Sequence, residues 1–370
     1  MGFHIVKRDK CPLWLRSCLY LGAILAALLI GAVILLSIGV DPFSYYYKML
    51  TMGTVGNKRA YTTIMNYINE FFPLALTSIA LSLAFKMRFW NIGGEGQFIV
   101  GAISASFVAL TLGGVLPSWL VLILMCLAAM LMAGLYGLIA GALKVKFGTS
   151  ETLMTLMLNY IALYVLVFFG ETKSDWNLFL QTESLRPVFQ SFASVVSFPL
   201  IPLGDKFQLN TCLLITLAVG AFIYVYMKRT KHGYEINVIG DSAGSAHYAG
   251  MKVNWIVLRT VFLSAALIGL AAALKMGSVG VLSTSITADV GWTGIIVAWL
   301  AQLNTGMILV VSALISVLQF GSTIAASTFG QVDSSFANML QGVILFLVLA
   351  ADFFIRFRIV RVKKGESENG

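Results

Sequence analysis

The sequence is short of charge. Asp, Glu, Lys and Arg make up 11% of its 370 residues, against about 25% in soluble globular domains, while 59% of the residues are hydrophobic. The mean hydropathy is +0.88. A surface with so few charges cannot be solvated by water. The composition therefore excludes a soluble domain and predicts a protein that uses the lipid bilayer as its main solvent.

Cysteine and histidine are also scarce. Two of the four cysteines, Cys11 and Cys18, lie beside a basic amino terminus, and the other two lie inside apolar runs. This spacing fits neither a disulfide framework nor a zinc site. The three histidines are scattered over the amino terminus and one loop. We therefore expect free thiols, no metal site and no catalytic residues.

Two binding motifs are missing as well. The sequence has no Gly-Lys dipeptide, so it has no phosphate-binding P-loop and no means of hydrolysing ATP by itself. The net charge is +9, but no basic stripe interleaved with aromatic residues is present, which excludes a nucleic-acid surface of the usual kind. The absences predict that the chain is not an enzyme and holds no cofactor of its own.

Long apolar runs, by contrast, are abundant. A bilayer crossing needs about 20 apolar residues, and fewer when the helix is broken or re-entrant. Ten runs qualify: 17–39, 71–87, 96–113, 117–142, 152–170, 209–227, 255–275, 291–303, 306–328 and 337–356. The second and eighth are short. The pattern predicts an all-α polytopic membrane protein of about ten transmembrane helices, with short or broken helices near the centre.

The basic residues orient these spans. Ten spans with the amino terminus inside place 18 of the 25 Lys and Arg residues on the inner side, as expected for a membrane protein. Both termini are then cytoplasmic, segments 40–70 and 171–208 are external, and segment 228–254 is cytoplasmic. The first run follows a basic stretch and is too long for a signal peptide, so we expect it to be retained. The whole of residues 1–370 is predicted to form one transmembrane domain.

Residues 88–102, RFWNIGGEGQFIVGA, interrupt the apolar pattern. In one interpretation Asn91 and Glu95 cap the free amides of a helix that starts near Gly96, and the glycines allow a sharp turn and close packing. In the other, the polar side chains form one wall of a solute path. The sequence leaves both open.

Residues 148–160, GTSETLMTLMLNY, hold a second polar group. Thr149 or Ser150 is placed to cap a helix with a carboxylate in its first turn. Thr155 and Asn159 then fall on one face. Such a stripe either lines an aqueous cavity or forms a hydrogen-bonded seam between helices.

Three further patterns concern helix faces. The short eighth run carries Trp292 and Trp299, whose rings could stack a flat ligand or anchor the chain at the membrane interface. Asp289, just before this run, is expected to be solvated. Small residues spaced by four in 133–141, AGLYGLIAG, predict close helix packing.

Three of these motifs together carry a family resemblance. FWNIGGEGQFIVGA, GTSETLMTLMLNYIA and GDSAGSAHYAGMKV resemble the permease subunits of bacterial ABC importers for branched-chain amino acids, simple sugars and nucleosides, and are most similar to the nucleoside-type permeases. The resemblance covers about residues 70–355. The chain departs from the family at Gln302–Gly306, which lacks an Arg and a Pro, at Asp289–Gly291, and at Trp90.

The resemblance implies a multi-pass permease domain in the bacterial cytoplasmic (inner) membrane that moves a small polar solute inward. A nucleoside is expected first and a simple sugar next. A separate ATPase would bind the ATP, a second permease would complete the pore as a heterodimer rather than a homodimer, and an extracytoplasmic lipoprotein would deliver the solute. The expected substrate path comprises Asn91, Glu95, Gln97, Thr155, Asn159 and Trp299. The expected coupling residues in loop 228–254 are Asp241, Ala243, Ala246, Tyr248 and Gly250.

Two alternatives remain at this stage. The chain could be a secondary transporter coupled to protons through Glu95, Glu151 or Asp289, or a membrane assembly protein or membrane-embedded enzyme that transports nothing. Neither the solute nor the composition of the dimer follows from the residues alone.

Overall fold

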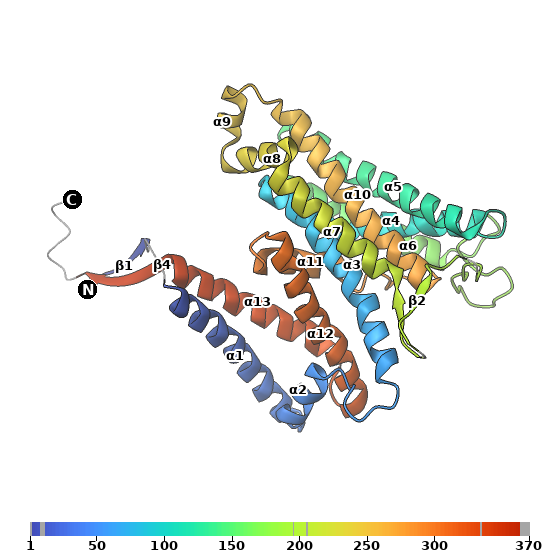
Figure 1. Cartoon of the computed structure of the whole chain (residues 1–370), viewed down its shortest axis with the longest axis horizontal. Helices are drawn as coiled ribbons and strands as arrows, with labels where there is room; N and C mark the ends of the chain where they lie inside the picture. The colour runs from blue at the N-terminus through green and yellow to red at the C-terminus, as the bar shows by residue number, and fades with distance from the viewer. Residues whose placement is uncertain (1, 8–11, 195, 205, 334, 363–370) are drawn as a thin grey trace. The chain divides into compact units, whose positions relative to one another are not determined.

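The computed structural model describes residues 2–7, 12–194, 196–204, 206–333 and 335–362 (Figure 1). In this part of the chain nine helices are long and apolar enough to span a membrane. They are α1 (Leu13–Ser37), α3 (Ala60–Lys86), α4 (Gly94–Leu112), α5 (Ser118–Phe147), α6 (Glu151–Glu171), α7 (Thr211–Arg229), α10 (Val253–Val279), α12 (Thr305–Phe329) and α13 (Ser335–Arg356). The prediction of an all-α polytopic membrane protein is confirmed.

The remaining elements are short. They are the helices α2 (Pro42–Leu50), α8 (Lys231–Asp241), α9 (Ala243–Tyr248) and α11 (Val290–Leu300), and the strands β1 (Gly2–Lys7), β2 (Leu200–Pro202), β3 (Gln208–Asn210) and β4 (Phe357–Val362). β1 pairs antiparallel with β4, and β2 pairs antiparallel with β3. Arg8, Lys10, Cys11, Lys363 and Lys364, which entered the sequence predictions, lie outside the described residues.

Contacts divide the chain into two compact units. The first comprises Met1–Asn57 and Val317–Gly370, and the second comprises Lys58–Ser316. In the first unit α1 packs on α13, and the buried Tyr45 hydroxyl lies 2.6 Å from the hydroxyl of Ser322. Helix α12 contributes residues to both units, so the single domain over residues 1–370 stays a prediction. The elements that build the candidate site all lie in the second unit.

The core of the second unit is made by α3, α4, α5 and α10, which meet through small residues. A Cβ added at Gly137 of α5 would lie 2.5 Å from the Cβ of Ala265 in α10, and one at Gly269 would lie 2.2 Å from the carbonyl oxygen of Ala129. Only small residues let two helix backbones come this close. The packing predicted from 133–141 is confirmed, and it fixes α10 against α5.

Replacing Gly269 with Ala should lower the stability of the purified protein by about 2 kcal/mol, because the new methyl group overlaps backbone that cannot move aside. Thermal unfolding of the protein in detergent measures this loss. Gly342→Ala on α13 is the matched control, since a Cβ there meets nothing within 4 Å. Equal melting temperatures for the two variants would show that the α5–α10 contact is looser than described.

Helix α3 is longer than its predicted span. The apolar run indicated 71–87, but the helix begins at Ala60 and so takes up the last part of segment 40–70. The polar side chains of its first turns find partners on neighbouring elements: Glu70 pairs with Lys275 of α10 at 2.7 Å, and Asn69 accepts a hydrogen bond from Asn210. Because these polar groups are satisfied, the helix can continue past the apolar run.

The eighth crossing is half loop and half helix. Gly280 ends α10 next to the segment before β2, where its carbonyl accepts the N–H of Phe192. The chain then runs as loop 280–289 to Gly291, beside Glu95, and continues as α11 until Trp299 meets Phe85, in the last turn of α3. Eleven helical residues rise about 16 Å, roughly half of the 30 Å hydrocarbon core. The prediction of a short helix at the eighth run is confirmed, while its crossing of the membrane together with loop 280–289 stays a prediction.

The loop between α7 and α10 is more ordered than predicted. The sequence indicated one or two helical turns in Ser242–Gly250, and α9 confirms this prediction. Helix α8 was not predicted, because its mixture of polar and apolar residues resembles that of a loop. Figure 1 shows α8 and α9 at one end of α7 and α10, with β2 at the other. Gly240 of α8 packs directly on the end of α3, since a Cβ there would lie 2.0 Å from the Lys86 carbonyl oxygen.

Candidate functional site

Two buried amides hold the turn between α3 and α4. Asn91 Nδ2 donates to Gln97 Oε1, and Gln97 Nε2 donates to Asn91 Oδ1, each at 3.1 Å. Asn91 Oδ1 also accepts the Gly93 N–H at 3.0 Å. The exposed fractions of the two side chains are 0% and 2%. The two amides therefore satisfy each other's hydrogen-bonding groups and hold the shape of the turn, and both are too deeply buried to contact a solute.

Two side chains of α6 hold the same turn from the other side. Thr155 Oγ1 accepts the Ile92 N–H at 3.1 Å, and Asn159 Nδ2 donates to the Ile92 carbonyl at 2.8 Å. Asn159 Oδ1 accepts the Gly96 N–H at 2.8 Å. Gly96 carries one of the first amides of α4, which have no partner within their own helix. Asn159 therefore caps α4 from a neighbouring helix.

Glu95 caps a different helix from its own. In one of the two interpretations of the sequence, its carboxylate caps the first amides of α4, but Oε2 accepts the Gly291 N–H, at the start of α11, at 2.8 Å. The Thr287 side chain and the Trp292 amide reach the same carboxylate. A helix amino terminus carries partial positive charge, so an acid there is favoured. The starts of α4 and α11 thus meet inside the span, an arrangement typical of transporter sites.

The glycines of this turn serve close packing. The prediction that they permit a sharp turn is wrong, because the left-handed residue is Arg88, with φ 57°, and none of the glycines in 93–96 has a positive φ. A Cβ at Gly96 would lie 3.0 Å from the Cα of Asn159. Any side chain there would push α4 away from α6 and from the amide that caps it.

A cavity of about 280 Å³ opens beside Glu95. Its lining residues are Glu95, Asn159, Tyr160, Leu163, Thr284, Ser285, Thr287, Ala288, Asp289 and Trp292. They supply two carboxylates, an amide, four hydroxyls and two aromatic rings, and none of them is basic. Such a lining suits a ring-shaped solute with many hydroxyl or amino groups and opposes an anion.

Most of this lining was not found from the sequence. Asp289 is exposed, as expected, and it also lines the cavity; Trp292, for which the sequence left ligand stacking and interface anchoring open, lines the cavity as well. Ala288 and Asp289 have left-handed φ values of 44° and 58°, which fold the loop back toward Glu95. The polar string TSITAD at 284–289, directly before an apolar half-helix, was the available signal.

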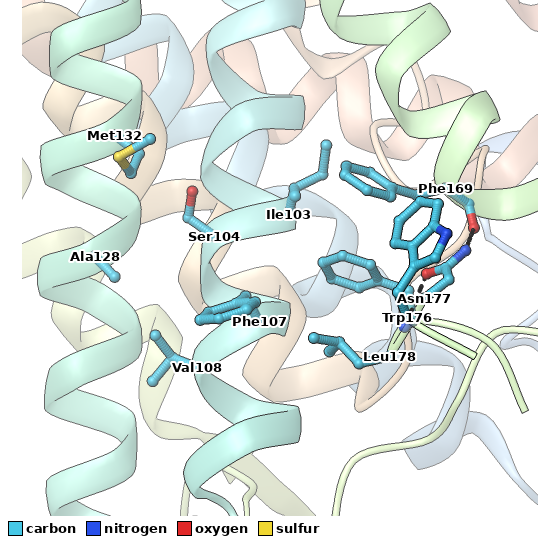
Figure 2. Close-up of a pocket in the computed structure, with 11 residues that line it drawn as sticks. Ile103, Ser104, Phe107, Val108, Ala128, Met132, Phe169, Trp176, Asn177 and Leu178 are labelled. Atoms are coloured by element: carbon cyan, nitrogen blue, oxygen red, sulfur yellow. Dashed lines mark hydrogen bonds between the residues drawn. The ribbon is translucent and has the colours of Figure 1, made fainter. Parts of the chain in front are cut away.

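A second cavity, of about 460 Å³, has the opposite character. α4, α5 and residues 169–179 line it, and Figure 2 shows Ile103 of α4 directed toward Phe169 and Trp176, with Val108 on the side of α4 toward Ala128. Asn177 is turned away into hydrogen bonds with the carbonyls of Phe169 and Thr172, both 2.8 Å. A polar solute would find almost no partners there, so the smaller cavity is the candidate site.

The structure separates the six residues predicted for the substrate path. Glu95 and Asn159 line the polar cavity. Asn91, Gln97 and Thr155 are buried behind it and hold the turn. Trp299 lies at the other end of α11, where its ring stacks on that of Trp90 with 5.3 Å between the centroids.

The residues predicted to couple with an ATPase lie on and around α9. Asp241, Ala243, Tyr248 and Gly250 are exposed, and 94% of the Tyr248 side chain is accessible. Ala246 is fully buried, so it packs α9 against its own chain.

An ion-pair cluster ties α8 to α10. Arg259 Nη2 donates to Glu235 Oε2 at 3.0 Å, and His232 Nδ1 lies 3.4 Å from the same oxygen. Burial by itself would raise the pKa of Glu235, but the hydrogen bonds from Arg259 and His232 outweigh it and hold that pKa below its ordinary value of 4.5. The ionised carboxylate therefore stabilises the folded state.

The lowered pKa of Glu235 makes the stability of the folded protein depend on pH. Because the pKa of Glu235 is lower in the folded state, its contribution is present above about pH 4.5 and is lost as the pH falls through the folded-state pKa. Glu235→Gln should lower stability by about 1–3 kcal/mol at pH 7, since Arg259 loses its partner, and the difference from the unchanged protein should shrink toward pH 4.

Thermal unfolding in detergent at pH 7 and pH 4 measures both effects. Glu183→Gln, which changes an exposed carboxylate in segment 171–208, is the control and should leave stability unchanged at either pH. A pH-independent difference for Glu235→Gln would mean that the carboxylate is not ionised in the folded protein.

Residues 240–244 match the Gly-x-Ser-x-Gly pattern of serine hydrolases. That pattern is catalytic when the serine sits on a turn between a strand and a helix, but here it joins α8 and α9. Ser242 is the N-cap of α9, and its Oγ accepts the Ser245 N–H at 3.2 Å. Within the described residues, no three His, Cys, Asp or Glu side chains gather as metal ligands would.

The geometry defines the class of protein. A helical membrane domain with a broken crossing, two helix starts meeting inside the span and a polar cavity beside them is a solute transporter. Residues 63–349 match the family described as the branched-chain amino acid transport system permease component, and the chain belongs to this family. It is the permease subunit of an ABC importer and a multi-pass protein of the bacterial cytoplasmic (inner) membrane.

Similar proteins cover nearly the whole chain. The nucleoside ABC transporter permease protein NupB of Lactococcus lactis is 28% identical over 344 residues, which are 92% of each chain. The guanosine ABC transporter permease protein NupP of Bacillus subtilis is 27% identical over 92% of this chain and 95% of its own. The glucose ABC transporter permease protein TsgB13 of Haloferax volcanii is 26% identical over 95% and 92%.

Membership in this family indicates which partner proteins the chain has. A permease subunit is not itself an enzyme, and in ABC importers the ATP is bound by a partner ATPase. The family also implies a protein that binds the solute outside the membrane.

Proposed function

We propose that this chain forms part of the path by which an ABC importer moves an uncharged, hydroxyl-rich ring solute into the cytoplasm. A nucleoside is the first choice and a simple sugar the second. The observation that carries the proposal is the polar cavity beside Glu95, which combines carboxylates, hydroxyls and rings with no basic residue. Similar permeases named for nucleosides, guanosine and glucose support the same class of solute.

The direction of transport and the coupling are part of the proposal. The end of the second unit that carries α8 and α9 also carries Lys86, Lys228, Arg229 and Arg259, which favours the cytoplasmic side. Loop 228–254 then faces the cell interior, and α9 presents Tyr248 to the ATPase. The chain itself holds no cofactor. A second permease, different from this one, completes the path.

Uptake into vesicles tests the function. The chain, reconstituted with its second permease, its ATPase and its binding protein, should accumulate guanosine or D-glucose when ATP is supplied on the side of loop 228–254. The chain alone, given a pH gradient, should accumulate neither. Uptake by the chain alone would establish proton coupling instead, and uptake of neither solute by the complete importer would refute the proposed solute class.

A further inference from the structure

Three aromatic rings meet at the end of α11 opposite the polar cavity. The rings of Trp90 and Trp299 are nearly parallel, with 16° between their planes and 5.3 Å between their centroids. Phe85, only 5% exposed, packs against both, at 6.2 Å from Trp90 and 5.8 Å from Trp299. The two tryptophans keep 47% and 37% of their surface accessible. A buried ring thus supports two stacked rings that are open on their outer side.

The pair lies on the same face of α11 as the polar cavity. Trp292 lines that cavity, and Trp299 follows it by seven residues, which is two helical turns. Between them Ile295 and Ile296 are partly exposed, whereas Thr293, Gly294, Val297 and Ala298 are buried. One face of the half-helix therefore leads from the cavity to the stacked rings.

We propose that Trp90 and Trp299 form a second binding site, which stacks a planar heteroaromatic ring such as a purine base as the solute leaves the polar cavity. The inference deepens the proposed function and rests on it. Stacking needs a flat, exposed ring held in a fixed orientation, and it tolerates any base because every base has a π-face. The cavity holds the hydroxyl groups of the solute, and the tryptophans take its ring.

Interface anchoring is the competing explanation for exposed tryptophans. An anchor needs only contact with lipid headgroups and gains nothing from a fixed partner. Here both rings have ring partners: Trp299 lies against Phe85 and Trp90, and Trp90 lies against Phe85 and Trp299. Trp255, at the start of α10 and 63% exposed, is a tryptophan on the same side of the second unit and serves as the control.

Uptake of guanosine and D-ribose by the complete importer in vesicles tests the proposal. Trp299→Leu keeps an apolar side chain but removes the π-face, so guanosine uptake should fall about tenfold. Trp299→Phe restores a ring and should stay within about twofold of the unchanged importer. Trp255→Leu should leave guanosine uptake unchanged. D-ribose has no planar ring, so any uptake of it should be the same for every variant.

The outcomes separate the two proposals. Guanosine uptake that survives Trp299→Leu, or that falls equally with Trp299→Phe or Trp255→Leu, overturns the stacking site and leaves the proposed function standing. If the unchanged importer takes up D-ribose but not guanosine, the stacking site is likewise overturned and the proposed function stands. Uptake of no nucleoside and no sugar refutes both. If Trp299→Leu does not fold, Trp90→Leu, with the same expected loss, decides the question.

Discussion

Glu95→Ala should reduce ATP-driven uptake about 100-fold, whereas Glu95→Gln should keep it within about threefold. The carboxylate, only 8% exposed, accepts an amide from the first turn of α11 at 2.8 Å. A hydrogen bond to a charged group contributes about 1.5–3 kcal/mol, and leaving the amide without a partner costs a similar amount. Glutamine still offers an oxygen in the same place, so α11 keeps its position. Uptake into vesicles, normalised to folded importer, measures both variants.

The comparison also distinguishes two mechanisms. If Glu95 carried a proton, glutamine would be as harmful as alanine, because neither titrates. Equal losses for the two variants would therefore contradict the capping role and favour proton coupling. Glu171→Ala, at the exposed far end of α6, is the control and should leave uptake unchanged.

Gly240→Ala should lower uptake about tenfold while ATP hydrolysis stays within about twofold. Gly240 lies where α8 meets the end of α3, and a Cβ would come within 2.0 Å of the Lys86 carbonyl oxygen. The added methyl group must shift α8 away from α3. The turn that holds Asn91 begins directly after that end, so a displaced α8 would transmit less of the ATPase's movement to the polar cavity. Parallel assays of uptake and hydrolysis on one preparation measure the ratio.

Gly114→Ala is the control for this experiment. It lies in the loop between α4 and α5, outside loop 228–254, and a Cβ there meets nothing within 4 Å. Both activities should be unchanged. If Gly240→Ala lowers uptake and hydrolysis in proportion, the contact serves stability alone, and the α8–α3 contact is not part of the coupling.

Apolar run length predicts the crossings well because the bilayer imposes one thickness on every span. It fails where protein replaces lipid as the surroundings. The first turns of α3 contain Asn69 and Glu70, which resemble a loop, but Asn210 and Lys275 from other elements satisfy them. Such partners come from distant parts of the chain, so no local pattern reveals them. Helix α8 was missed for the same reason, since Arg259 of α10 holds it.

In the candidate site, too, the sequence indicated the polar residues but not the distant residues that they contact. Motif residues such as Glu95 and Asn159 were identified correctly as a polar group, but their partners were not. Glu95 caps a half-helix 196 residues away in the sequence, and the hydroxyls at 284–287 reach the cavity only because loop 280–289 turns back into the span. Residue type therefore indicates that a site exists, whereas its lining depends on the path of the chain.

The half-length of α11 has a consequence for how the protein is made. Eleven apolar residues are too few to partition into the bilayer as an independent segment during synthesis. We therefore expect α11 to take its place only once α3 and α4, on which it packs, are in position and Glu95 of α4 can accept its leading amide. The half-helix beside the polar cavity would then be among the last parts of this permease to reach its final position.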